Sequence, residues 1–143
     1  MRYIRTVSAA PRLILKNVGP IGKADVSFAD LTVLVGPQAT GKSLFLQFLK
    51  LVLDHSSVTG TMRKYGLDWN SDTEKFLDVY LGRGMSSVWT GKGKSRSWID
   101  WQGRPVGLDG MVAEKEAGGE HQECLVIPAQ RVLAFLAELV APV

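Results

Sequence analysis

The sequence predicts an α/β fold in a single domain. Three features lead to this prediction: a short β-hairpin over residues 12–28, a nearly continuous apolar run over residues 31–35, and a Leu- and Phe-rich segment over residues 42–53. The apolar run is typical of a strand buried on both faces. The segment that follows the intervening glycine-rich turn is typical of a mostly buried helix. With 143 residues, 45% of them hydrophobic, the chain is long enough for one such domain, and two full domains are not expected.

The remaining chain alternates between strand and helix signals. Residues 12–18 and 24–28 form the two strands of the first hairpin, and residues 71–81 form a short helix, with Ser71 as its N-cap and Glu74 at the capping-box spacing. Residues 86–90 and 95–101, joined by a turn at 91–94, predict a second hairpin. We further expect an exposed loop over 107–119, a buried strand over 123–127 and a helix over 132–140.

Composition limits where the protein acts. A single cysteine, Cys124, cannot form an internal disulfide, which fits a reducing cytoplasm. We expect a cytoplasmic location and no membrane partner, because the sequence contains no apolar run of membrane-spanning length and no signal-peptide pattern. The two histidines, His55 and His121, are too far apart in sequence to suggest a shared metal site.

The glycine-rich turn matches the pattern G-x-x-x-x-G-K-[ST], known as Walker A. The predicted phosphate-binding residues are Gly36, Pro37, Gln38, Ala39, Thr40, Gly41, Lys42 and Ser43. The loop stands between an apolar strand and an apolar helix, which is the context that its chemistry requires. Gly36 allows the sharp turn out of the strand, and Gly41 lets the backbone approach the phosphates.

This loop predicts binding of ATP with Mg²⁺. Backbone amides at the start of the helix would face the phosphates, where the helix dipole favours an anion. Lys42, the predicted catalytic residue, would reach the β and γ phosphates, and the Ser43 hydroxyl would ligate Mg²⁺. The alternative is a glycine-rich turn from strand to helix that holds no ligand.

Residues 13–21 (LILKNVGPI), 31–37 (LTVLVGP) and the loop resemble the start of ABC-type ATPase heads of the RecF, SMC and OLD-like AAA ATPase kind. Residues 127–131 (IPAQR) resemble a segment that follows a buried strand in OLD-like ATPases. The resemblance implies the three-layer α/β sandwich of P-loop NTPases, with this chain as its N-terminal lobe and the antiparallel hairpin at its start. It also implies that Gln130 is the Q-loop ligand of Mg²⁺. A surface glutamine at a helix start is the alternative.

The chain departs from this family in two ways. The family loop reads G-P-N-G-x-G-K-S, whereas Gln38 and Ala39 replace its Asn and second Gly, so Ala39 must accept whatever backbone angles the loop imposes. The Walker B strand and the Ser-Gly signature are not recognisable, and residues 51–54 (LVLD) continue the predicted helix. The resemblance covers about residues 12–55 and 123–131. We therefore expect residues 1–143 to form a single but incomplete ATPase domain, whose apolar helix at 132–140 contacts a missing C-terminal lobe or a second ATPase head.

The net charge of +3 is unevenly distributed. The segment 83–104 carries five basic residues and one acid, Asp100, and the four tryptophans lie between residues 69 and 101. Cations interleaved with aromatics suit nucleic acid, so DNA is a possible partner through Arg83, Lys92, Lys94, Arg96 and Arg104. The alternative is that the tryptophans are cross-strand packing partners in a solvated hairpin.

The leading functional prediction is an ATP- and Mg²⁺-binding lobe that gates a DNA-linked activity such as repair, recombination or phage defence. The DNA-linked part rests on family analogy alone. Hydrolysis of ATP would require a lobe or partner that carries Walker B. The alternatives are a small P-loop phosphotransferase and a nucleotide-binding fragment without turnover of its own. A GTPase is not expected, because the chain has no Asn-Lys-x-Asp.

Overall fold

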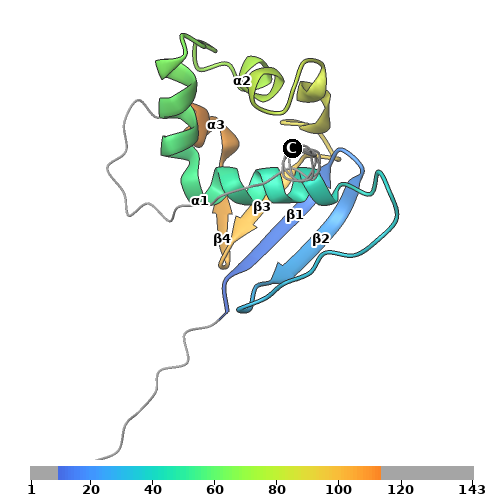
Figure 1. The fold of residues 1–143 in the computed structure, drawn as a ribbon. Coiled ribbons are helices and arrows are strands. Elements are labelled where there is room, and N and C mark those ends of the chain that lie inside the picture. The colour runs from blue at the N-terminus through green and yellow to red at the C-terminus, as the bar shows by residue number, and fades with distance from the viewer. Residues whose placement is uncertain (1–9, 114–143) are drawn as a thin grey trace, which may run out of the picture.

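The computed structural model describes residues 10–113, and these form an α/β protein with one antiparallel sheet and helices packed against it (Figure 1). The strands are β1 (Arg12–Val18), β2 (Ile21–Ser27), β3 (Trp98–Trp101) and β4 (Arg104–Val106). The helices are α1 (Lys42–Lys64), α2 (Thr73–Tyr80), the 3-10 helix η1 (Met85–Val88) and α3 (Leu108–Ala113). The strand order is β2-β1-β3-β4, so a strand from late in the described sequence pairs with the first one.

The first hairpin is confirmed. β1 pairs with β2 from Arg12 opposite Ser27 to Val18 opposite Ile21, so the turn is Gly19-Pro20. The second strand begins three residues earlier than predicted and ends at Ser27. Alternate residues of β1, Leu13 and Leu15, are fully buried, which defines the inner face of the sheet.

The core lies between this inner face and α1, which runs across the sheet (Figure 1). The helix contributes Leu44, Phe45, Phe48 and Leu51, all buried. The Phe48 ring stacks on Trp89, with their centroids 5.8 Å apart. This packing holds the first turn of α1, and therefore the loop before it, beside the hairpin.

The predicted helix at 42–53 is confirmed, but it extends to Lys64. Asp54 has non-helical backbone angles (φ −143°, ψ 32°), so α1 consists of two helical halves that meet at a kink. A serine pair, Ser56 and Ser57, follows the kink, as is common at such bends. Residues 51–54 belong to the helix, as the sequence predicted.

The predicted strand at residues 31–35 is wrong. This segment has no regular secondary structure, and its side chains at 31, 33 and 35 are 81%, 68% and 86% exposed. A strand buried on both faces needs a neighbouring strand and a covering layer on each side. Within residues 10–113 the four strands pair among themselves, so nothing there provides these partners for the apolar run.

The predicted second hairpin is also wrong. Residues 85–88 form η1, and only Trp89 makes a bridge, to Val18. The second predicted strand is reduced to β3, which pairs with β1 on one side and β4 on the other. Ser97 lies buried before β3, where its backbone N–H donates to the Thr90 carbonyl and its hydroxyl accepts from the Thr90 N–H. β3 therefore pairs with the free edge of β1 and not with residues 86–90, which were its expected partner.

Two further predictions need correction. Helix α2 lies within the predicted 71–81, but its N-cap is Asp72, whose carboxylate accepts from the N–H groups of Glu74 and Lys75, and not Ser71. The predicted loop 107–119 contains α3, whose Leu108, Met111 and Val112 are buried. These three residues follow helical spacing, and the adjacent glycines at 107 and 110 hide that signal in the sequence.

The junction between α2 and η1 is held by a carboxylate. Asp78 accepts a 2.7 Å hydrogen bond from the Ser86 N–H, and this bond lowers the pKa of Asp78. Because the folded pKa lies below the ordinary value, the bond stabilises the junction at neutral pH, and this stabilisation is lost as the pH falls through the lowered pKa.

The predicted strand 123–127, the predicted helix 132–140, Cys124 and Gln130 lie outside the described residues. Among the helices of residues 10–113, none combines the length and apolarity needed to cross a membrane.

Candidate nucleotide-binding site

The predicted phosphate loop is an exposed turn that leads directly into α1. Gly41 precedes the helix with φ +90°, a backbone conformation that favours glycine. A Cβ on Gly41 would lie 2.6 Å from Ile21 Cγ1. The loop is therefore packed closely on the hairpin, and Gly41 is required there for steric reasons besides any approach of phosphate.

The Lys42 ammonium is folded back into this loop. Its Nζ donates to the Gly36 carbonyl at 2.8 Å, to the Pro37 carbonyl, and to the Thr40 hydroxyl at 3.3 Å. The Thr40 hydroxyl in turn donates to the Pro37 carbonyl at 3.0 Å. The chain thus curls around the positive charge of its own lysine and offers it neutral oxygen acceptors.

The position at which the family pattern has its second glycine is occupied by Ala39, with φ +59°. This is the left-handed region, which costs an L-residue about 1–2 kcal/mol. The sequence left open which backbone angles the loop imposes on Ala39, and the structure shows a left-handed one. The loop adopts this shape despite that cost.

The start of α1 has unused hydrogen-bond donors. No side-chain hydrogen bond caps the helix at Gly41, and its first turn contains no acidic residue. Its first intrahelical bond runs from the Phe45 N–H to the Gly41 carbonyl at 2.8 Å, which leaves the earlier N–H groups outside the helical pattern. Together with the helix dipole, such groups favour an anion, and Ser43 stands exposed beside them.

A groove of about 410 Å³ lies between the loop and the second strand of the hairpin. Its lining residues are Pro20, Ile21, Gly22, Lys23, Ala24, Val26, Val33, Leu34, Val35, Thr40, Gly41, Lys42 and Phe45. Two of these are lysines and none is Asp or Glu. Within residues 10–113, moreover, no cluster of three or more His, Cys, Asp and Glu side chains could hold a metal ion. The groove can therefore attract an anion, but the described residues place no carboxylate there to activate water.

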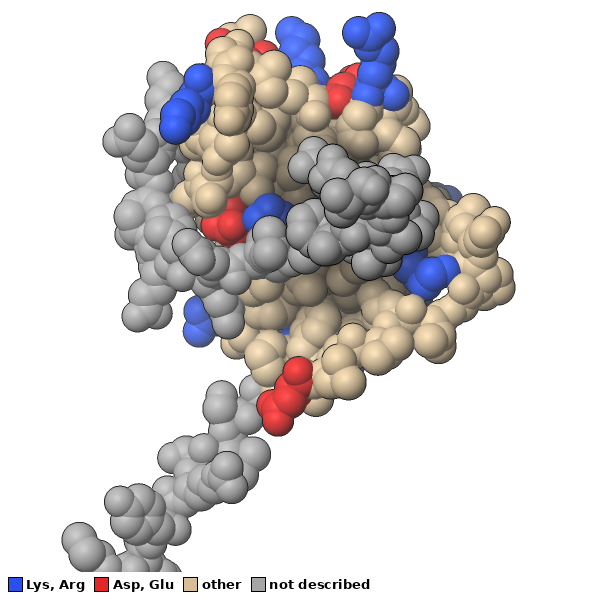
Figure 2. All heavy atoms as spheres, in the orientation of Figure 1, with Lys and Arg blue, Asp and Glu red and all other residues tan. Residues whose placement is uncertain are grey.

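The structure brings the eight loop residues together, whereas it separates the basic residues of segment 83–104. Arg83 lies between α2 and η1, Lys92 to Arg96 lie in the exposed loop before β3, and Arg104 begins β4. Arg104 pairs with Trp101 at the end of β3 that is remote from Arg96. On the face shown in Figure 2, Lys and Arg side chains are scattered and form no single patch.

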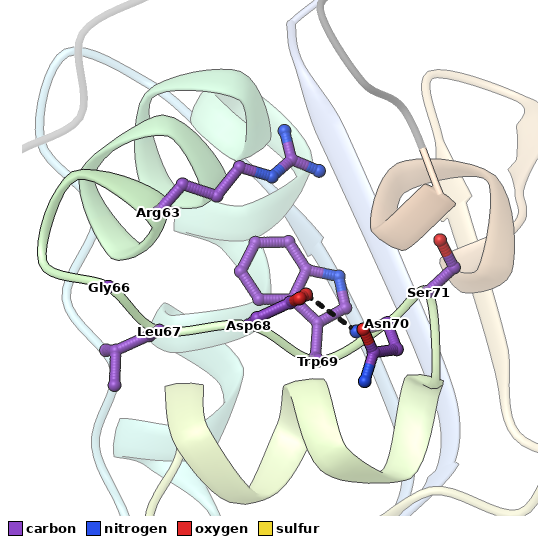
Figure 3. Close-up of a pocket in the computed structure, with 7 residues that line it drawn as sticks. All are labelled: Arg63, Gly66, Leu67, Asp68, Trp69, Asn70 and Ser71. Atoms are coloured by element: carbon purple, nitrogen blue, oxygen red, sulfur yellow. Dashed lines mark hydrogen bonds between the residues drawn. The ribbon is translucent and has the colours of Figure 1, made fainter.

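A larger hollow, of about 570 Å³, was not predicted from the sequence (Figure 3). It lies after the C-terminus of α1 and is lined by Arg63, Gly66, Leu67, Asp68, Trp69, Asn70 and Ser71. Its polar groups already have partners: Arg63 lies over the Trp69 ring at 4.9 Å, and Asp68 accepts from the Asn70 N–H at 2.8 Å. The Trp69 Nε1–H donates to the Val112 carbonyl. Although this hollow is the larger of the two, the partners of Arg63, Asp68 and Trp69 leave these groups less available to a ligand. We therefore favour the groove at the loop as the candidate binding site.

Comparison of the chain with models of known protein families, with curated proteins and with solved structures finds no match.

Proposed function

We propose that this chain binds Mg-ATP through residues 36–43. The observation that carries the proposal is the Walker A octapeptide in position at the uncapped start of α1, with the Lys42 ammonium already inside the loop. A glycine-rich turn without a ligand would have no need of a lysine surrounded by backbone carbonyls or of an alanine held at positive φ.

Binding requires a local exchange of partners. Lys42 would turn from its neutral acceptors at Gly36, Pro37 and Thr40 toward the β and γ phosphates. An ammonium and a phosphate carry opposite charges, so their hydrogen bonds gain a Coulomb attraction that the neutral carbonyl and hydroxyl acceptors do not offer. The amides from Ala39 to Ser43 would face the phosphates, and the Ser43 hydroxyl would ligate Mg²⁺. Gln130 would complete the metal site from outside the described residues.

We place the chain as the N-terminal lobe of an ABC-type ATPase head. The exposed apolar run 31–35 supports this, because in the three-layer P-loop sandwich it would be an interior strand. Its exposure here fits a lobe that another lobe or a partner completes. The DNA-linked activity of the family is carried over by analogy.

Binding without turnover is the second candidate for the isolated chain, and the absence of Asp and Glu from the described lining of the groove favours it. A phosphotransferase has less support. It would need arginines that converge on the loop, and Arg83, Arg96 and Arg104 lie in three separate segments.

The test is a titration of the full chain with a fluorescent ATP analogue and Mg²⁺. Lys42→Ala is expected to weaken binding at least tenfold, because it removes the cation that contacts two phosphates. Lys64→Ala is the matched control, since it removes an exposed lysine from the last turn of the same helix. Equal affinities for wild type and Lys42→Ala would overturn the proposal. If GTP displaces the fluorescent analogue as readily as ATP does, the site does not prefer adenine over guanine.

A further inference from the structure

Three residues on adjacent strands form a row across the sheet face that α1 does not cover. Lys16 of β1 pairs directly with Lys23 of β2 on one side and with Trp98 of β3 on the other. Directly paired residues point to the same face. Leu15 and Ile99 next to them are buried on the inner face, so Lys16, Lys23 and Trp98 lie on the outer one.

Trp98 differs from the other three tryptophans. Trp69 is buried, and Trp89 and Trp101 are partly buried against the core. Trp98 is 41% exposed on the solvent side of the sheet. Packing in the described core therefore explains the positions of the other three indoles. The Trp98 indole remains accessible to a ligand on the outer face of the sheet.

The lysines of the row are not neutralised by acids on the same face. Asp25 accepts two hydrogen bonds from the Arg12 guanidinium, one from Nε and one from Nη2, each at 2.7 Å. The Asp100 carboxylate accepts from the Gly103 N–H at 2.8 Å. Within the described chain, neither Lys16 nor Lys23 has a carboxylate within 4.0 Å. The hydrogen bonds from Arg12 lower the pKa of Asp25, and the charges of Lys23 and Lys16 lower it further.

Two like charges placed directly opposite each other destabilise a sheet. The Lys16–Lys23 pair therefore weakens this hairpin where an apolar or oppositely charged pair would strengthen it. A third cation, Arg96, is exposed two residues before Trp98, and the Asn17 side chain holds its backbone carbonyl at 3.2 Å. Arg96 and Trp98 are both exposed, and both line one small hollow beside β3.

We propose that this outer face binds single-stranded nucleic acid, with a base stacked on Trp98 and the backbone phosphates on Lys16, Lys23 and Arg96. Neighbouring strands are about 4.8 Å apart, so the row from Lys23 to Trp98 spans about 10 Å, the scale of one nucleotide and its neighbour. A base can stack on an indole only if it is unpaired, which favours single strands over duplex. DNA and RNA share this chemistry.

This surface differs from the one that segment 83–104 suggests in the sequence. Two of its cations, Lys16 and Lys23, come from the first hairpin, and Arg96 alone is shared. Lys16 and Trp98 do not line the groove of the proposed nucleotide site, whereas Lys23 belongs to both surfaces. Variants of Lys16 and Trp98 therefore test it without disturbing that groove.

The experiment measures fluorescence anisotropy of labelled oligo-dT, oligo-rU and a mixed-sequence duplex with the full chain, in the absence of ATP. Trp98→Ala is expected to weaken single-strand binding about tenfold, because it removes the ring on which a base stacks. Trp98→Phe, which keeps an aromatic ring, is expected to retain most of the binding. Lys16→Gln is expected to lower the affinity and to reduce the slope of log affinity against log salt by about 0.7. Lys64→Gln removes the same charge at the far end of α1 and should change neither.

Thermal unfolding of each variant verifies that it is folded. Lys42→Ala separates the two proposals: it changes the proposed ATP site and is expected to bind single strands like wild type, whether or not the chain binds ATP. No single-strand binding by wild type at low salt would overturn the inference. So would unchanged binding by both Trp98→Ala and Lys16→Gln, or a duplex affinity equal to that for single strands. Preference for oligo-rU or for oligo-dT would identify which nucleic acid the surface recognises.

Discussion

Two residues of the loop, Ala39 and Gly41, both have positive φ, yet only one of them is glycine. Gly41 is additionally confined by the hairpin, because its Cβ would lie 2.6 Å from Ile21 Cγ1. Ala39 lies at the exposed tip of the turn, where the cost is one of backbone conformation alone. The two positions should therefore respond oppositely to exchange of Ala and Gly.

We expect Ala39→Gly to raise the free energy of unfolding by about 1 kcal/mol, since it relieves a left-handed L-residue. Gly41→Ala should lower it by more than that, because a steric overlap with Ile21 is added to the unfavourable φ. Urea denaturation of both variants measures the difference. Destabilisation by Ala39→Gly would contradict the assigned loop conformation.

At this scale the sequence shows that Ala39 stands where the family pattern has glycine, but it does not show which backbone angles the loop imposes there. It could not predict the Gly41–Ile21 contact, which arises only when the hairpin packs on the loop. Nor could it predict the row Lys23–Lys16–Trp98, because that row depends on the register of two strand pairs.

Helix α1 contains a buried ion pair at its kink. Lys50 Nζ lies 3.0 Å from Asp54 Oδ2, and the two side chains are 26% and 6% exposed. Within the described structure, Asp54 Oδ1 is buried without a hydrogen-bond partner. A buried charge of this kind is costly when its partner is removed.

Lys50→Met is therefore expected to destabilise the protein by about 2 kcal/mol, a value reduced from that of fully buried pairs because Lys50 is partly exposed. The double variant Lys50→Met with Asp54→Leu should recover most of the loss, because no charge is then left buried. Chemical denaturation of the three proteins provides the measurement. If the double variant is less stable than Lys50→Met alone, Asp54 has a role other than that of the lysine's partner.

Among the elements, the first hairpin, the start of α1 and helix α2 were predicted, whereas the run 31–35, the second hairpin and α3 were not. The first hairpin and α1 follow clear patterns of two and 3.6 residues, and both are present. The run 31–35 reads as a strand because of its composition, but a strand also needs partners that residues 10–113 do not provide. The local hairpin expected around residues 91–94 is replaced by pairing of β3 with β1, which no local pattern could indicate.

At the scale of the whole molecule, the proposed phosphate loop borders a groove whose described lining includes no catalytic carboxylate. The groove beside the loop is lined by Lys23, Lys42 and apolar residues, and by no Asp or Glu. Positioning of water and stabilisation of transition-state charge provide most of phosphoryl-transfer catalysis. Binding and hydrolysis should therefore be separable in this chain.

We expect the 143-residue chain to bind Mg-ATP and to hydrolyse it negligibly, as measured by phosphate release under steady-state conditions. Addition of a lobe or partner that carries a Walker B carboxylate should restore turnover. Steady hydrolysis by a monomer, lost in Lys42→Ala, would show that a carboxylate beyond the groove lining reaches the loop.

The α/β class of the molecule followed from its sequence, because an apolar hairpin and an apolar helix must cover each other. Its sheet did not follow, since the order β2-β1-β3-β4 joins residues remote in sequence. The predicted contribution of residues beyond 113, including Gln130, stays a prediction.

The same strand order has a consequence for synthesis of the protein. β1 can pair with β2 as soon as both have left the ribosome, because hairpins form within about 1–10 μs. Its other edge waits for β3, and the contact between Asn17 and Arg96 spans 79 residues of sequence. At roughly 5–20 residues per second, that edge stays unpaired for several seconds. During this interval the nascent chain exposes the edge of β1 that β3 covers in the finished sheet, which is when a chaperone or a second nascent copy would have access to it.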